Sequence, residues 1–167
     1  MRAATDPSPP IVPTRPAWPW VATALRVGLG AVALVAGLTK ISDLPASVRA
    51  VRAYQLLPEG PAVLIGNALP LVEVILGALL VVGLFTRVLA AVFGLMLGAF
   101  AIGIGSAWAR GLAIDCGCFG GGGAIDPGNT SYLLDLLRDV ALITVAAVLV
   151  RRPHSRLSLD SALDLSL

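Results

Sequence analysis

Four continuous apolar stretches dominate the chain, and polar, glycine-rich or proline-rich segments separate them. Each stretch is about as long as the ~20 apolar residues that a helix needs to cross the hydrocarbon core of a membrane. The apolar residues run without the alternation that membrane-spanning β-strands require. The pattern therefore predicts an all-α membrane protein, a bundle of four transmembrane helices. We expect these helices at Val21–Leu38, Val63–Leu84, Val88–Ala107 and Leu133–Val150.

The segments outside the spans predict the domain organisation. Residues 1–20 carry six of the twelve prolines, and proline interrupts helices, so we expect a disordered proline-rich tail. Residues 21–150 form the membrane domain, and residues 151–167 form a polar C-terminal tail. A cleaved signal peptide is the alternative for the N-terminus, since Val27–Leu38 has the length of an apolar signal region. The long proline-rich lead-in differs from the short basic segment of signal peptides.

Composition supports this assignment. Hydrophobic residues make up 57% of the 167 residues and charged residues only 13%, which is more apolar than a soluble globular domain. The abundant glycine (18 residues) suits helices that pack closely through small side chains. We therefore expect a multi-pass membrane protein, surrounded by the lipid bilayer, and no nucleic-acid partner.

Basic residues near the span ends predict the orientation, because cytoplasmic loops carry more Lys and Arg. Both tails are then cytoplasmic, and loops 39–62 and 108–132 are extracytoplasmic. The predicted cytoplasmic side carries Arg2, Arg15, Arg87, Arg151, Arg152 and Arg156. The opposite side carries Lys40, Arg49, Arg52 and Arg110.

The first outer loop has apolar residues at helical spacing. This spacing predicts a short amphipathic helix over Leu44–Leu57 that lies on the outer membrane surface. Its apolar positions are Leu44, Val48, Val51, Tyr54 and Leu57.

The only two cysteines, Cys116 and Cys118, are separated by Gly117 in the second outer loop. The extracytoplasmic side is where disulfides form and persist. A disulfide needs Cα atoms about 4.4–6.8 Å apart, so the backbone must bend, which Gly117 permits. A disulfide across so short a loop braces a fold poorly but suits redox exchange. The pair is therefore the candidate catalytic site, supported by loop residues Asp115, Gly117, Phe119 and Gly120.

The order of attack can also be predicted from the loop. The carboxylate of Asp115 should raise the pKa of the adjacent Cys116 by charge repulsion, which favours Cys118 as the first nucleophile.

Two other interpretations of the cysteine pair are weaker. A metal site usually needs four ligands, whereas the loop offers two thiols and Asp115, and His154 is predicted on the opposite side. Ordinary small buried cysteines are not expected in a glycine-rich polar loop.

Charged residues within the predicted spans form a second candidate site, because charge is unfavourable in lipid. They are Arg26, Glu73, Asp135, Arg138 and Asp139. The last three lie at positions i, i+3 and i+4 and so share one helix face. We hypothesise that Glu73 pairs with Arg138 or with Arg26, in an intramembrane polar pocket for a proton path or a quinone head group. Ion pairs that only fix helix register are the alternative.

Several motifs together resemble the methylamine utilisation protein MauE family, within the wider DoxX-like group, over about Val21 to Val150. They are Gly37-Leu-Thr-Lys40 with Asp43, Tyr54-Gln-Leu-Leu-Pro58, Pro70-Leu-Val-Glu73 with Gly77, and Arg110-Gly111 before Asp115-Cys-Gly-Cys-Phe-Gly120. Relatives often carry Arg-Asn where this chain has Arg138-Asp139. The resemblance implies a protein of a bacterial cytoplasmic membrane. It also implies a role in extracytoplasmic disulfide chemistry with a thioredoxin-like partner, as in maturation of the disulfide-rich small subunit of methylamine dehydrogenase.

The sequence thus predicts a component of a thiol–disulfide oxidoreductase system, in which Cys116 and Cys118 cycle between dithiol and disulfide with a thioredoxin-like extracytoplasmic protein. Quinone is the candidate cofactor, and a larger membrane complex is a candidate setting. The alternative is a non-redox membrane scaffold, or an accessory subunit of an oxidoreductase complex. A scaffold should tolerate loss of both cysteines, whereas a redox carrier should not tolerate loss of either.

Overall fold

The computed structural model describes residues 17–153 and 155–162. Most of the predicted N-terminal tail, together with His154 and residues 163–167, lies outside the described residues. The helices are α1 (Trp18–Ile41), α2 (Leu44–Ala53), α3 (Glu59–Val82), α4 (Thr86–Ala109), α5 (Tyr132–Arg151) and α6 (Leu159–Ala162). A short antiparallel hairpin of β1 (Ile114–Asp115) and β2 (Gly123–Ala124), then the 3-10 turn η1 (Pro127–Asn129), connect α4 to α5.

Three of these helices are long and apolar enough to cross a membrane: α1, α3 and α4, each of 24 residues. The prediction of a multi-pass helical membrane protein is confirmed to that extent. The fourth predicted span corresponds to α5, which is present in the predicted place but is shorter, with 20 residues. Its first two turns carry Asp135, Arg138 and Asp139.

Local sequence signals set where the helices begin and end. Pro19 lies in the first turn of α1, where its missing N–H is not needed. The side chain of Asp43 caps α2 by accepting a hydrogen bond from the N–H of Ala46 (2.9 Å). The helix ends at Ala53, before Gln55 adopts a φ of +52°. Gly83 ends α3 in the left-handed conformation common after a helix.

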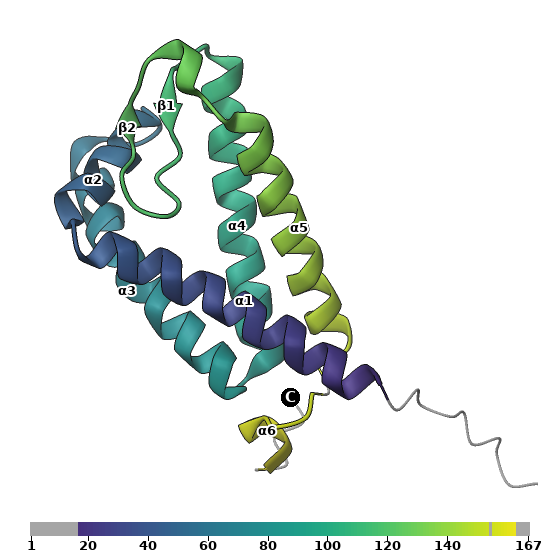
Figure 1. Cartoon of the computed structure of the whole chain (residues 1–167). Helices are drawn as coiled ribbons and strands as arrows, with labels where there is room; N and C mark the ends of the chain where they lie inside the picture. The colour runs from purple at the N-terminus through teal and green to yellow at the C-terminus, as the bar shows by residue number, and fades with distance from the viewer. Residues whose placement is uncertain (1–16, 154, 163–167) are drawn as a thin grey trace, which may run out of the picture.

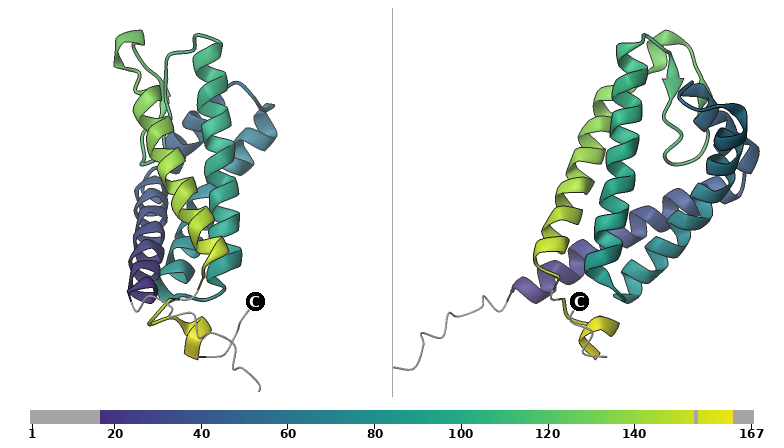
Figure 2. Two further views of the ribbon diagram at one scale, coloured as in Figure 1. Left: turned by 90° about the vertical axis from the view of Figure 1, so that its right-hand side faces the viewer. Right: turned by 180° about the vertical axis from the view of Figure 1, so that it is seen from behind.

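The helices form two pairs. α1 packs mainly against α3, and α4 mainly against α5. The first pair is very close: a Cβ added at Gly77 would lie 2.7 Å from the carbonyl oxygen of Gly30, and one at Gly37 would lie 2.7 Å from that of Pro70. Small residues therefore allow α1 and α3 to pack backbone to backbone. Figure 1 and Figure 2 show the pairs converging near α6 and diverging toward the hairpin.

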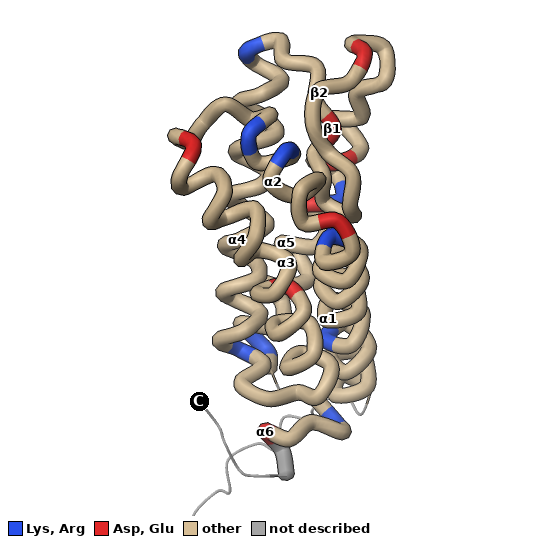
Figure 3. The backbone as a smooth tube through the Cα atoms, turned by 90° about the vertical axis from the view of Figure 1, so that its left-hand side faces the viewer, with Lys and Arg blue, Asp and Glu red and all other residues tan. Residues whose placement is uncertain are grey.

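Two apolar clusters hold the molecule together. The larger one joins both helix pairs and includes Leu29, Leu80, Phe93 and Leu149. The smaller one lies at the hairpin end and consists of Tyr54, Ile104, Ala107, Ile114, Cys116 and Tyr132. Cys116 therefore belongs to a packed cluster that joins the hairpin to α4 and α5. The charged residues gather mostly toward the two ends of the bundle, as Figure 3 shows.

Arg26 lies at the α6 end of the bundle and does not contact Glu73. The prediction that these two residues pair in one polar pocket is therefore wrong. The guanidinium of Arg26, 1% exposed, donates hydrogen bonds to the carbonyl oxygens of Leu80 (2.7 Å), Val81 (2.8 Å) and Leu157 (3.0 Å). The first two are at the C-terminus of α3, where a cation compensates the helix dipole. Arg26 is thus a structural residue that connects α1, α3 and the C-terminal segment.

Candidate functional site

The tip of the hairpin carries both cysteines, and glycine allows it to bend. Gly117 has a φ of +69°, a conformation that residues with a side chain rarely adopt. Its N–H donates a hydrogen bond to Asp115 Oδ1 (3.1 Å). A Cβ at Gly117 would lie 2.6 Å from the Cβ of Ala50 in α2. The tip therefore needs glycine both for its backbone conformation and for its close contact with α2.

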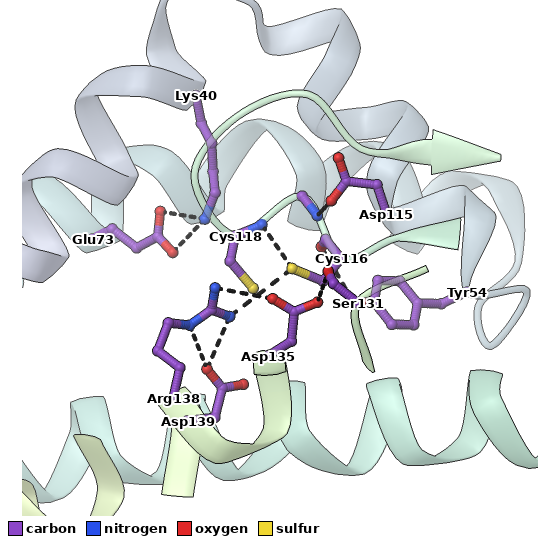
Figure 4. Close-up of polar contacts among 11 residues, drawn as sticks. Lys40, Tyr54, Glu73, Asp115, Cys116, Cys118, Ser131, Asp135, Arg138 and Asp139 are labelled. Carbon is purple, nitrogen blue, oxygen red and sulfur yellow. Dashed lines mark hydrogen bonds and ion pairs between the residues drawn. The ribbon is translucent and has the colours of Figure 1, made fainter. Parts of the chain in front are cut away.

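Both cysteines are free thiols, and they lie in different surroundings. Cys116 is buried, with 8% of its surface exposed, whereas Cys118 is only partly buried. The N–H of Cys118 donates to Cys116 Sγ at 3.5 Å, and the hydroxyl of Tyr54 donates to the carbonyl oxygen of Cys116 at 3.1 Å. These contacts, seen in Figure 4, fix the position of Cys116 within the hairpin.

Arg138 of α5 connects the hairpin to the helix bundle. Its Nη2 donates to Cys116 Sγ at 3.9 Å, and Figure 4 shows the guanidinium between the thiols and two carboxylates. Those carboxylates are Asp135, 3.2 Å from Nη1, and Asp139, 3.1 Å from Nη2. Its Cζ also lies 5.1 Å from the centre of the Phe119 ring, in a cation–π contact. The predicted cluster on α5 is therefore an ion-pair network that faces the cysteines.

The two carboxylates of this network are themselves held differently. The hydroxyl of Ser131 donates to Asp135 Oδ2 at 3.0 Å, so both oxygens of Asp135 have partners. Asp139 is 1% exposed, and its Oδ2 has no hydrogen-bond partner among the residues that the structure describes. The buried carboxylate of Asp139 thus depends on Arg138 for its only described polar contacts.

The pKa values of the two thiols are shifted in opposite directions. The pKa of Cys116 is lowered, first because the Cys118 thiol hydrogen-bonds to it and also because of the Cys118 N–H and Arg138, although burial and Asp135 oppose this. The pKa of Cys118 is raised by the same thiol contact and by burial. The prediction that Asp115 raises the pKa of Cys116 is wrong, because this pKa is lowered by contacts with Cys118 and Arg138. The preference for Cys118 as the first nucleophile, which depended on it, is wrong as well.

Glu73 has a different partner from those predicted. Lys40 Nζ lies 2.6 Å from Glu73 Oε1 and 2.8 Å from Oε2, and the two side chains are 4% and 3% exposed. The hypothesis that Glu73 pairs with Arg138 or Arg26 is therefore wrong. A first span that ends at Leu38 leaves Lys40 in a loop, whereas α1 continues to Ile41 and contains it. Lys40 lies three residues after Gly37, on the helix face that packs on α3. This spacing is the sequence signal for Lys40 as the partner of a buried charge.

Part of the predicted pocket exists as a small cavity beneath the hairpin. Its lining residues come from both helix pairs and from the hairpin, and include Glu73, Cys118, Phe119, Arg138 and Asp139. The volume is about 20 Å³, which is room for about one water molecule and far too little for a quinone ring. This cavity therefore does not fit the quinone that the sequence suggested.

The fold and the site define a small, multi-pass helical membrane protein with a dithiol hairpin packed between its helices. The chain matches the model of the family described as methylamine utilisation protein MauE over residues 18–152. Because this match covers most of the 167 residues, the chain belongs to that family, as its motifs predicted. No curated protein and no solved structure matches the chain.

Proposed function

We propose that this protein is an integral membrane redox partner that exchanges a disulfide between Cys116 and Cys118 and a thioredoxin-like extracytoplasmic protein. The observation that carries the proposal is the pair of free thiols on one glycine bend, with Arg138 and the Cys118 N–H both directed at Cys116 Sγ. The family name supports a role in methylamine utilisation, in which the exchange supports maturation of a secreted, disulfide-rich protein of the methylamine dehydrogenase type.

The site suits thiol–disulfide exchange chemically. The thiolate is the reacting form of cysteine, and nearby cations and hydrogen-bond donors favour it. Arg138 supplies the cation, and the backbone N–H of Cys118 supplies a donor. In the exchange, the dithiol of one protein becomes a disulfide and gives up two electrons and two protons, which the disulfide of the other protein takes up. No further cofactor is needed for this step.

The arrangement of charges supports the proposed place of the hairpin. α5 lies alongside α4, and the charged residues of its first two turns pair with one another, as charges within membranes do. We therefore include α5 as a fourth span. The α6 end then carries Arg87 and the Arg151-Arg152 pair, and this basic charge supports a cytoplasmic location for both termini. The hairpin lies outside, where a secreted thioredoxin-like protein is accessible.

Helix α2 is part of the same proposal. It packs against α3 and the hairpin through Ala46, Val48 and Ala50, while Arg49 and Arg52 are exposed. We propose that α2 is amphipathic and lies at the outer surface of the membrane, where it packs against the cysteine loop.

The experiment that tests the function is complementation of a deletion strain. Cys116→Ser, Cys118→Ser and the double variant are compared with wild type, and the readout is the disulfide content of exported proteins, measured by thiol labelling. Ala124→Ser, an exposed change in the same hairpin, is the control. Loss with either single cysteine variant supports redox exchange. Full complementation by the double variant would instead identify a scaffold or accessory subunit.

A further inference from the structure

The two sulfurs of the hairpin are not equivalent, and the difference assigns them separate roles. Cys116 is the more buried residue, packed in the apolar cluster at the hairpin end. Its Sγ receives the Arg138 guanidinium at 3.9 Å and the Cys118 N–H at 3.5 Å. Cys118 is more exposed and borders the small cavity. Burial disfavours charge, but these two donors act on Cys116 Sγ, so negative charge is better accommodated on Cys116 than on Cys118.

We propose that the Cys116–Cys118 disulfide is an electron acceptor, in which an incoming thiolate attacks Cys118 and Cys116 is the leaving group stabilised by Arg138. This inference rests on the proposed function and adds the direction of electron flow and the order of the sulfurs. A disulfide whose reduced form is stabilised is more oxidising, and a stabilised thiolate leaves faster. Arg138 acts on the sulfur as a positioning residue, through charge and hydrogen bonding.

The step balances with a dithiol protein as the electron donor. Its first thiolate forms a bond to Cys118 Sγ, the Cys116–Cys118 bond breaks, and the electron pair remains on Cys116 Sγ. The second thiolate of the donor then attacks the donor's other sulfur in the mixed disulfide, and Cys118 leaves as a thiolate. Cys118 and Cys116 take up the two protons that the donor thiols gave up. The donor has become a disulfide, and the hairpin has gained two electrons as the dithiol.

The order of the sulfurs is tested on the full-length wild-type protein in lipid nanodiscs. The cysteine pair is oxidised mildly and then exposed briefly to limiting reduced glutathione. N-ethylmaleimide stops the reaction, and tandem mass spectrometry shows which cysteine carries glutathione and which carries maleimide. We expect glutathione on Cys118 and maleimide on Cys116, in at least about tenfold excess over the reverse product. Glutathione mainly on Cys116 would overturn the assignment.

The role of Arg138 is tested by the equilibrium between the pair and glutathione. Arg138→Gln should lower the equilibrium constant for reduction of the disulfide about tenfold, equivalent to about 30 mV for this two-electron couple. Arg138→Lys should restore most of the difference, because it keeps the positive charge. Arg49→Gln, which removes an exposed charge on α2, should leave the constant unchanged. An unchanged constant in folded Arg138→Gln would overturn the proposal.

Failure of this inference can be told apart from failure of the proposed function. If mild oxidation of the wild-type protein yields no disulfide between Cys116 and Cys118, as seen by the intact mass, the redox function itself is wrong. The disulfide can form as proposed while glutathione is found on Cys116, or while Arg138→Gln keeps the wild-type equilibrium constant for reduction. In either case only the direction of electron flow and the roles of the sulfurs are wrong.

Discussion

Lys40 of α1 and Glu73 of α3 form a buried ion pair with a shortest N–O distance of 2.6 Å. The pair lies where the first helix pair borders the cavity beneath the hairpin. Two charges that are removed from solvent depend on each other, because the loss of one leaves the other without compensation.

Removal of one partner should therefore destabilise the protein strongly. We expect Lys40→Met to lower the free energy of unfolding by about 3–5 kcal/mol, and Glu73→Leu to behave alike. The double variant should recover most of the loss, since a pair of apolar residues of similar size needs no compensation. Thermal unfolding in detergent measures the effect. A loss in the double variant equal to the sum of the two single losses would show that the two charges do not depend on each other.

The shifted thiols predict a dependence of reactivity on pH. Alkylation follows the thiolate fraction, so the rate for Cys116 should reach half its plateau below about pH 8.5, the value of an ordinary cysteine. The rate for Cys118 should rise only at higher pH. The neighbouring groups that shift the pKa of Cys116 are Cys118, Asp135 and Arg138. Iodoacetamide labelling resolved by mass spectrometry measures both profiles, and identical midpoints would refute the assignment.

The bend at the hairpin tip should not tolerate a side chain. Gly117→Ala places a Cβ 2.6 Å from that of Ala50 and keeps a φ of +69°, so we expect a loss of about 1–3 kcal/mol and faster proteolysis of the loop. Gly128→Ala is the matched control, because nothing lies within 4 Å of its added Cβ. Similar protease sensitivity in both variants would show that the tip is not packed as described.

The C-terminal segment should stabilise the start of α4. Asp160 accepts hydrogen bonds from the N–H groups of Phe85 (2.7 Å) and Thr86 (2.9 Å), which a helix start otherwise leaves unsatisfied. Asp160→Ala should cost about 0.5–2 kcal/mol and increase hydrogen exchange at these two amides. Asp126→Ala, in the loop before η1 with no such side-chain cap, should change neither. Unaltered exchange in Asp160→Ala would exclude the cap.

The sequence was informative wherever a property depends on local pattern. Each long helix begins and ends within four residues of its predicted bounds, because an apolar run and its flanking Pro, Gly and Asp residues act over short distances. The cysteine bend follows equally from Gly117. The predicted cluster on α5 also follows from helical spacing, since Asp135, Arg138 and Asp139 share one face.

The contacts between elements could not be predicted in the same way. The pairing of Glu73 with Lys40 depends on three extra residues of α1, a length that an apolar pattern does not fix. The contact of Arg138 with Cys116 depends on the hairpin folding back between the helix pairs. Asp115 is the neighbour of Cys116 along the chain, but its carboxylate accepts a hydrogen bond from the Gly117 N–H of the turn.

The most direct test of the account is the redox state of Cys116 and Cys118 in intact cells. Cells are quenched with acid, and thiols are labelled with a mass-tagged maleimide before and after reduction, so that the gel shift counts free thiols. We expect a mixture that contains the disulfide, and an increase in the oxidised fraction when the thioredoxin-like electron donor is deleted. Two thiols that stay reduced under every condition would contradict it.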